Sequence, residues 1–96
     1  MIGYIYKITN SINGMFYIGS TINIEKCWHR HLNELRSHCH HNMFLSRAFE
    51  KYGEESFELT YKEINVSDEN ELRRIEERYI NFCWNSGKLY NLSKKG

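Results

Sequence analysis

The chain has 96 residues, 41% of them hydrophobic and 15% aromatic, which suffices for one hydrophobic core and leaves little room for a second. Thirteen Lys and Arg residues against twelve Asp and Glu give a formal charge of +1, which excludes nucleic-acid binding through a strong overall positive field. Cys27, Cys39 and Cys83 are too few and too scattered for a disulfide framework, and no apolar run approaches the roughly 18 residues of a membrane-spanning helix. We therefore expect a cytoplasmic protein with no membrane partner.

The first twenty residues have the pattern of a β-hairpin. Aromatic and β-branched residues fill positions 4–9 and 15–19, and Asn13 and Gly14 lie between them as a pair typical of tight reversals. Positions 57–64 alternate as a third strand does, and residues 89–92 predict a short extended piece packed on the core.

Two amphipathic helices are predicted after the hairpin. Asn23 can cap the first, residues 24–37, whose apolar side chains recur at helical spacing. The second, residues 43–52, is followed by Gly53, which can end it by adopting a left-handed conformation.

A third helix is predicted after Ser67 or Asp68, because Asp68 and Glu71 have the spacing of a capping box. Its apolar stripe is made of Leu72, Ile75, Tyr79, Ile80 and Phe82. The order of elements is ββααβα, which predicts an α+β fold with helices packed against a small sheet. We expect one domain over residues 1–92 and a C-terminal tail at 93–96.

Tyr6 and Tyr17 lie on the two strands of the predicted hairpin, where cross-strand pairing can bring both phenols to one side. The general habits of tyrosine favour the alternative of ordinary sheet aromatics with their hydroxyls in water. Gly19 ends the second strand, and a glycine there can let a phosphate or a helix approach the backbone closely.

Cys27 and His31 are one helical turn apart, so their side chains point into the same space, and His40 lies in the loop beyond. With the His-Cys-His-His run at 38–41, these residues allow a small zinc-binding module as an alternative function. Their spacing fits no standard zinc finger.

Glu76 lies beside the apolar stripe of the third predicted helix. Mg²⁺ prefers one or two carboxylates together with water, so metal binding is one hypothesis for this residue. The alternative is a solvated carboxylate next to Arg73 and Glu77.

Two of these segments resemble the motifs that name the GIY-YIG nucleases. They are Gly3-Tyr4-Ile5-Tyr6 before the turn and Tyr17-Ile18-Gly19-Ser20 after it. The similarity continues through His31, Glu76 and the segment before Asn91, and so covers nearly the whole chain. Among the family, the chain is most similar to the catalytic domains of T-even phage intron homing endonucleases.

The resemblance implies a central three-stranded antiparallel sheet with the active site on one face. It also implies a DNA endonuclease that hydrolyses phosphodiester bonds with a single divalent metal, Mg²⁺ or Mn²⁺, inside a phage-infected, virus-infected or bacterial cell. The implied roles are activation or orientation of water by Tyr6, metal binding by Glu76, ordering of the site by Asn91, and contacts near the phosphate by Tyr17, His31 and His40.

The chain departs from the family pattern at Cys27, where the family has an arginine that can bind the phosphate through two parallel hydrogen bonds. A thiol carries no fixed positive charge, so we expect impaired activity or none. Arg30 lies three residues further along, about 60° away around a helix, so easy replacement by it is not expected. Tyr4, in place of the glycine of the motif, is expected to be harmless.

Double-stranded DNA is the implied substrate, and homing relatives join this kind of domain to a separate DNA-binding region, which we expect as a partner. The cations that could contact the DNA backbone are Lys7, Lys26, Arg30, Arg36 and Arg47. Each could equally be a solvated surface charge. A non-catalytic DNA-binding or regulatory module of the same fold is a second alternative function, because Cys27 lacks the charge of an arginine.

Overall fold

The computed structural model describes residues 1–92, so the predicted tail at 93–96 lies outside the described residues. Three strands form one antiparallel sheet in the order β2-β1-β3. The strands are β1 (Ile2–Asn10), β2 (Phe16–Thr21) and β3 (Phe57–Asn65). The helices are α1 (Ile24–Arg36), α2 (Met43–Tyr52) and α3 (Glu69–Cys83), with short 3₁₀ helices η1 (Glu54–Ser56) and η2 (Trp84–Ser86). The predicted α+β class and ββααβα order are confirmed.

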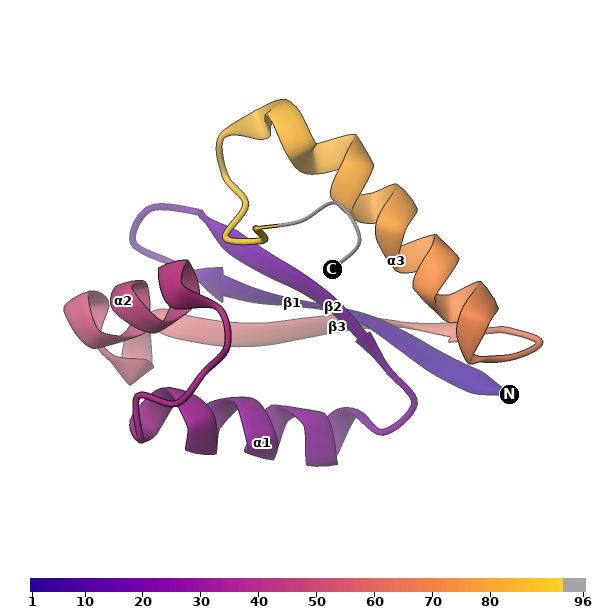
Figure 1. Ribbon diagram of the computed structural model, residues 1–96, viewed down its shortest axis with the longest axis horizontal. Helices are drawn as coiled ribbons and strands as arrows, with labels where there is room; N and C mark the ends of the chain where they lie inside the picture. Colours follow the sequence, from indigo (N-terminus) through magenta and orange to yellow (C-terminus); the bar gives the residue numbers. More distant parts are fainter. Residues whose placement is uncertain (93–96) are drawn as a thin grey trace.

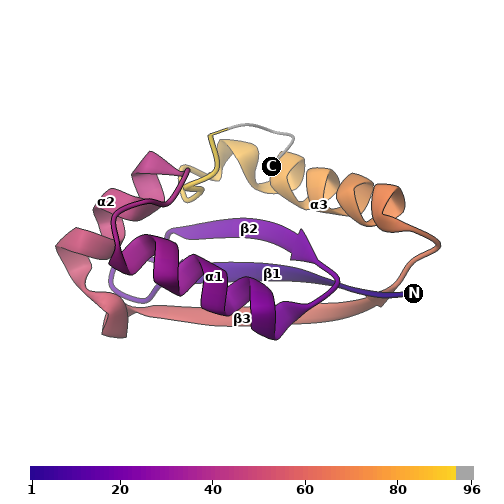
Figure 2. The same ribbon diagram turned by 60° about the horizontal axis from the view of Figure 1, so that its bottom comes forward.

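The sheet lies between two helical layers (Figure 1). Helices α1 and α2 pack on one face and α3 on the other, and the turned view in Figure 2 shows the same arrangement. Alternation along β1 explains this, because Tyr6 and Ile8 point to the α1 face while Ile5 points to the α3 face. The sheet is therefore buried on both sides, and two separate hydrophobic clusters stabilise it.

The hairpin sets the register of the two strands that carry the tyrosines. Gly14 adopts a φ of +75°, which favours glycine, and its N–H donates to the Asn10 carbonyl at 2.8 Å. Tyr6 then lies opposite Gly19, and Ile8 lies opposite Tyr17. The predicted hairpin is confirmed.

Each helix begins at a side-chain cap. Asn23, Asn42 and Asp68 accept hydrogen bonds from backbone N–H groups in the first turns of α1, α2 and α3. The end of α2 differs from the prediction, because Gly53 has φ 87° and ψ 155°, which is not a left-handed helical conformation. An extended ψ is needed there because the chain turns at once into η1 and β3.

Phe82 was wrongly assigned to the buried stripe of α3, since its side chain is 92% exposed. It lies two residues after the buried Ile80, roughly 200° around the helix, and so points away from the sheet.

The extended segment after η2 is confirmed. Leu89 forms a parallel bridge with Phe16, whose N–H and carbonyl bond Lys88 and Tyr90 at 2.8 Å. No helix within residues 1–92 is long and apolar enough to cross a membrane.

Candidate active site

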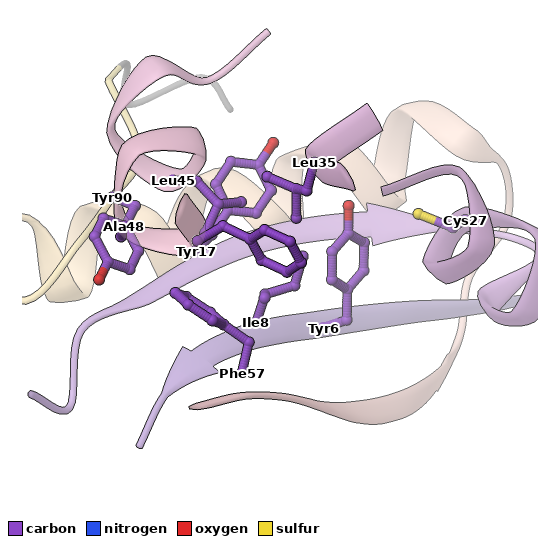
Figure 3. Packing of buried hydrophobic residues seen from close by; sticks show 10 residues of the cluster. Tyr6, Ile8, Tyr17, Cys27, Leu35, Leu45, Ala48, Phe57 and Tyr90 are labelled. Atoms are coloured by element: carbon purple, nitrogen blue, oxygen red, sulfur yellow. The ribbon is translucent and has the colours of Figure 1, made fainter. Parts of the chain in front are cut away.

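Tyr6 and Tyr17 lie side by side on the α1 face of the sheet, with ring centroids 6.5 Å apart. They are diagonal neighbours, because Tyr6 pairs with Gly19 and Tyr17 with Ile8. Both side chains are buried, and the Tyr6 hydroxyl lies 2.7 Å from His31 Nε2, so Tyr6 does not fit the alternative of a sheet aromatic with its hydroxyl in water. Figure 3 shows both rings rising from adjacent strands into the core cluster under α1 and α2.

Gly19 is required by the ring of Tyr6. A Cβ atom at this position would lie 2.3 Å from Cζ and from the hydroxyl oxygen of Tyr6, which no real contact allows. The positive-φ glycines in the described part of the chain are Gly14, Gly53 and Gly87, so conformation is not the reason for Gly19. The close approach predicted at Gly19 therefore exists, but the group that approaches is a phenol from the neighbouring strand.

His40, His31 and Tyr6 form a continuous chain of hydrogen bonds. His31 Nε2 lies 2.7 Å from the Tyr6 hydroxyl, and His31 Nδ1 lies 2.7 Å from His40 Nε2. The backbone N–H of Asn42 donates to His40 Nδ1 at 3.0 Å. Helix α1 supplies His31, and the loop before α2 supplies His40, so the structure brings together three of the predicted site residues.

The direction of this chain is fixed from the Asn42 end. Because His40 Nδ1 accepts a hydrogen bond, the proton of neutral His40 is on Nε2, which donates to His31 Nδ1. His31 then carries its own proton on Nε2 and donates it to Tyr6. Burial, followed by neighbouring His40, lowers the pKa of His31 to about 3, and burial followed by His41 lowers the pKa of His40. Both rings are therefore neutral at pH 7.

Neither tyrosine ionises readily in this environment. Burial, with a further effect of Cys27, raises the pKa of Tyr6 far above its ordinary value. Burial and the charge of Glu76 raise the pKa of Tyr17 to about 12. A neutral Tyr6 that accepts a hydrogen bond from His31 has its own O–H left to direct toward another group.

Glu76 approaches the same region from α3, on the other face of the sheet. Ser20 on β2 donates a hydrogen bond to Glu76 Oε1, and Glu76 is half-buried, so its carboxylate is not fully solvated. Burial raises the pKa of Glu76, and the Ser20 bond opposes this rise. The charge of Glu76 also contributes to the raised pKa of both Tyr6 and Tyr17.

Cys27 lies buried on α1 in the same cluster as Tyr6 and Tyr17. In Figure 3 its sulfur lies on the side of the sheet to which the Tyr6 hydroxyl points. Arg30 Nη2 lies 3.9 Å from the sulfur. Beside these two residues a cleft of about 490 Å³ opens at the start of α1.

Asn91 holds β2 through both polar atoms of its side chain. Its Oδ1 accepts from the Ile18 N–H and its Nδ2 donates to the Ile18 carbonyl, each at 2.9 Å. The preceding residue, Tyr90, is also tied down, because Asn42 Nδ2 donates to its carbonyl at 3.0 Å. Asn91 thus fixes the strand that carries Tyr17, which agrees in geometry with the ordering role implied for it.

Among residues 1–92, one group of His, Cys, Asp or Glu side chains is close enough to hold a metal through three ligands. It consists of His31, Glu34 and His40, with ligand atoms within 4.8 Å of one another. Cys27 is outside this group, and Cys39 is exposed, with its Sγ 3.4 Å from the Ser37 carbonyl. The ligand set of the alternative zinc-binding module is therefore not assembled. The Asn42 bond also leaves a proton on the His40 nitrogen that a metal would need.

The five candidate DNA-contacting cations lie in different places. Lys26 and Arg30 line the cleft beside Cys27. Lys7 lies on the α3 face, over the ring of Phe16 at 4.5 Å. Arg36 is held by Glu54 through two bonds of 2.6 Å, and Arg47 is exposed on α2.

Sequence reasoning missed three contributors to this site. They are Ser20, which bonds Glu76, His41, whose Nε2 lies 3.4 Å from the Tyr17 hydroxyl, and Asn42, which orients His40. The position of Ser20 directly after Gly19 and the tandem His40-His41 were available as signals. The N–H of Asn42 leaves no signal, because every residue except proline has one.

Comparison with known proteins agrees with this geometry. Residues 2–90 match the family described as the GIY-YIG catalytic domain. Two solved structures superpose closely. A mutant of the catalytic domain of intron endonuclease I-TevI is 30% identical, with a TM-score of 0.85 over 98% of this chain and 96% of that one. The catalytic domain of homing endonuclease I-TevI is 31% identical, with a TM-score of 0.82 over 93% and 96%.

A curated relative, intron-associated endonuclease 1 of Enterobacteria phage T4, is 43% identical over 49 residues. The aligned segment is 51% of this chain and 20% of the relative, so the chain corresponds to a small part of that protein. The resemblance inferred from the two tyrosine motifs is confirmed by these matches.

Proposed function

Since the chain belongs to the GIY-YIG catalytic domain family, we propose that it is the nuclease domain of a homing-type endonuclease, which hydrolyses phosphodiester bonds in double-stranded DNA. The observation that carries this proposal is the hydrogen-bonded series His40–His31–Tyr6 beside Tyr17, with Glu76 arriving from the opposite layer. These residues come from β1, β2, α1, the loop before α2, and α3, and the fold brings them to one region.

We further propose that Glu76 holds a single divalent cation, Mg²⁺ or Mn²⁺. The oxygen donors of Glu76 and Ser20 suit a hard cation, whereas the imidazole pair of His31 and His40 suits Zn²⁺ better. A cation held by Glu76 would supply positive charge to offset the negative charge that develops on the phosphate during hydrolysis. A bound cation would also favour the ionised carboxylate, opposing the effect of burial on the pKa of Glu76.

In this proposal Tyr6 orients the attacking water and is not its main base. Its raised pKa disfavours the phenolate, whereas its oxygen is held in place by the proton on His31 Nε2. Tyr17 and His41 provide further polar groups on the same side of the sheet. The chain of histidines keeps Tyr6 in one orientation, and rigid positioning of this kind lowers the activation free energy.

Cys27 should weaken catalysis, because a neutral thiol cannot stabilise charge on the phosphate as a guanidinium does. We expect Cys27→Arg to raise the rate of supercoiled-plasmid nicking with Mg²⁺ by on the order of 10²-fold. A second substitution, Glu76→Ala, should abolish the gain, as should a chelator. His29→Arg is the matched control, because it adds the same guanidinium to an exposed position of α1 and should leave the rate unchanged.

A non-catalytic DNA-binding module is the second candidate function, favoured by the uncharged thiol at Cys27. If Cys27→Arg binds duplex DNA but never nicks it, the nuclease proposal is wrong and this alternative stands. We also propose that a separate DNA-binding region supplies target choice in the cytoplasm of a bacterial or virus-infected cell, since the alignment spans only 20% of the phage relative.

A further inference from the structure

The cleft beside Cys27 has the chemistry of a phosphate site. It is lined by Thr21, Ile22, Asn23, Lys26, Cys27 and Arg30. The two cations lie one turn apart on α1, so both side chains project along the same side of the helix. The volume of the cleft is about 490 Å³.

Arg30 is the cation in this cleft that is available for a ligand. Its Nη2 lies 3.9 Å from the Cys27 sulfur, and no carboxylate within residues 1–92 forms an ion pair with it. Arg36, six residues further along α1, is instead already occupied by two bonds of 2.6 Å to Glu54. A guanidinium held next to a neutral thiol keeps nearly all of its donors for another partner.

The charge of Arg30 also reaches the catalytic groups. It lowers the pKa of Tyr17, where it opposes the larger effects of burial and Glu76. It contributes, after burial and His40, to the lowered pKa of His31. The positive charge of Arg30, an exposed residue of α1, thus acts electrostatically on two residues at the centre of the site.

We propose that Arg30 is the active-site cation of this chain and binds the non-bridging oxygens of the phosphate that is cleaved, with Lys26 contacting a neighbouring phosphate. This inference rests on the proposed nuclease function. The 60° offset between positions 27 and 30 argued against such a replacement, but the observed contact shows that the long arginine side chain spans it. A small residue at Cys27 leaves the space into which the guanidinium can turn.

Plasmid nicking by four variants tests the proposal. Arg30→Ala should lower the residual rate by at least about 10-fold, and Arg30→Lys should lower it less, because a lysine keeps the charge and loses the two parallel bonds. In the Cys27→Arg background, Arg30→Ala should cost less than about 3-fold, since the new arginine supplies the same interaction. Arg74→Ala, which removes an exposed arginine from α3, is the matched control and should have no effect. Equal rates for wild type and Arg30→Ala would overturn the proposal.

A binding measurement separates failure of this proposal from failure of the nuclease function. Titration with inorganic phosphate, followed by the NMR resonances of the Arg30 guanidinium and the Tyr17 ring, should shift both signals in wild type. The Tyr17 shift should vanish in Arg30→Ala and persist in Arg74→Ala. If Cys27→Arg nicks DNA but phosphate leaves the Arg30 signal unmoved, the nuclease function stands and the role of Arg30 is refuted. If phosphate moves the signal and no variant nicks, Arg30 is an anion-binding residue of a non-catalytic domain.

Discussion

The side chain of Tyr6 depends on three neighbours that act in different ways. Gly19 leaves space for its ring, and His31 donates a hydrogen bond to its oxygen. Asn42 fixes the direction of that hydrogen bond indirectly, by donating to His40, which in turn donates to His31. The sequence predicted that Tyr6 and Tyr17 share one side of a hairpin, because alternation and turn chemistry are local properties. The contribution of Asn42 was not predictable, since it is made by a main-chain N–H whose position depends on the folded loop.

His31 predicts a loss of stability in acid. Its pKa is about 3 in the folded protein and near its ordinary value of 6.5 in the unfolded chain, so only the unfolded chain binds the proton between these values. The contribution of His31 to the free energy of unfolding should be fully present above pH 6.5. It should then decrease by about 1.4 kcal/mol per pH unit as the pH drops toward 3. His31→Gln should flatten this slope in urea unfolding measured between pH 7 and 4.

The exposed His29 provides the comparison, because the same substitution there removes a histidine that is in water in both states. His29→Gln should leave the pH slope at the wild-type value. Identical slopes for His31→Gln and wild type would show that His31 is not buried in its neutral form.

At the scale of elements, the C-terminal segment acts as an additional partner of β2. The backbone of Phe16 bonds the backbone of Lys88 and Tyr90, and two residues later the backbone of Ile18 bonds the side chain of Asn91. The side-chain amide of Asn91 thus bonds the edge of β2 directly after the backbone bonds of Lys88 and Tyr90 end. This arrangement joins the end of the described chain to the strand that carries Tyr17.

We expect Asn91→Ala to destabilise the protein by about 1–3 kcal/mol, because it leaves the buried N–H and carbonyl of Ile18 without partners. Denaturant unfolding should show this as a lower midpoint. Asn70→Ala, at an exposed position in the first turn of α3, should change the free energy of unfolding by less than about 0.5 kcal/mol. If Asn91→Ala unfolds at the wild-type midpoint, the two hydrogen bonds between Asn91 and Ile18 contribute nothing to stability.

Element boundaries followed from local chemistry and were predicted within about two residues. The caps at Asn23 and Asp68 and the turn at Gly14 are encoded by the residues themselves. Errors arose where the surroundings decide. Gly53 takes its conformation from the turn into η1, and Phe82 is apolar by composition but points to solvent. No hydrophobic pattern indicates the conformation of Gly53, whereas the helical spacing of Phe82 from Ile80 does indicate that Phe82 points to solvent.

At the scale of the whole molecule, the candidate site draws on both helical layers. Glu76 belongs to α3, whereas His31 and Cys27 belong to α1 on the other face of the sheet. Helical periodicity placed Glu76 next to an apolar stripe, but its approach to the tyrosines depends on how α3 crosses β2. That relation became known only from the three-dimensional arrangement, which explains why the family resemblance was needed to select Glu76.

The distribution of cations predicts weak DNA binding, with a salt dependence that arises from cations on the α1 face. Lys26 lines the cleft of the α1 face, whereas Lys7 lies on the opposite face over Phe16. Lys26→Gln should lower the slope of log affinity against log salt by about one, since one phosphate contact is lost. Lys7→Gln, measured by fluorescence anisotropy on the same duplex, should leave the slope unaltered. Equal effects of the two substitutions would argue against binding through the α1 face.

The bonds made by Lys88, Tyr90 and Asn91 have a consequence for how copies of this protein behave in concentrated solution. A flat strand with free N–H and carbonyl groups recruits strands from other molecules, and β2 would offer such a template if Phe16 and Ile18 were unpaired. The outer strand β3 instead carries the charged side chains of Glu58, Lys62 and Glu63, and charged residues on an edge strand disfavour pairing with another copy. One edge of the sheet, β2, is thus protected from self-assembly by its pairing with the C-terminal segment, and the other edge, β3, by charged side chains.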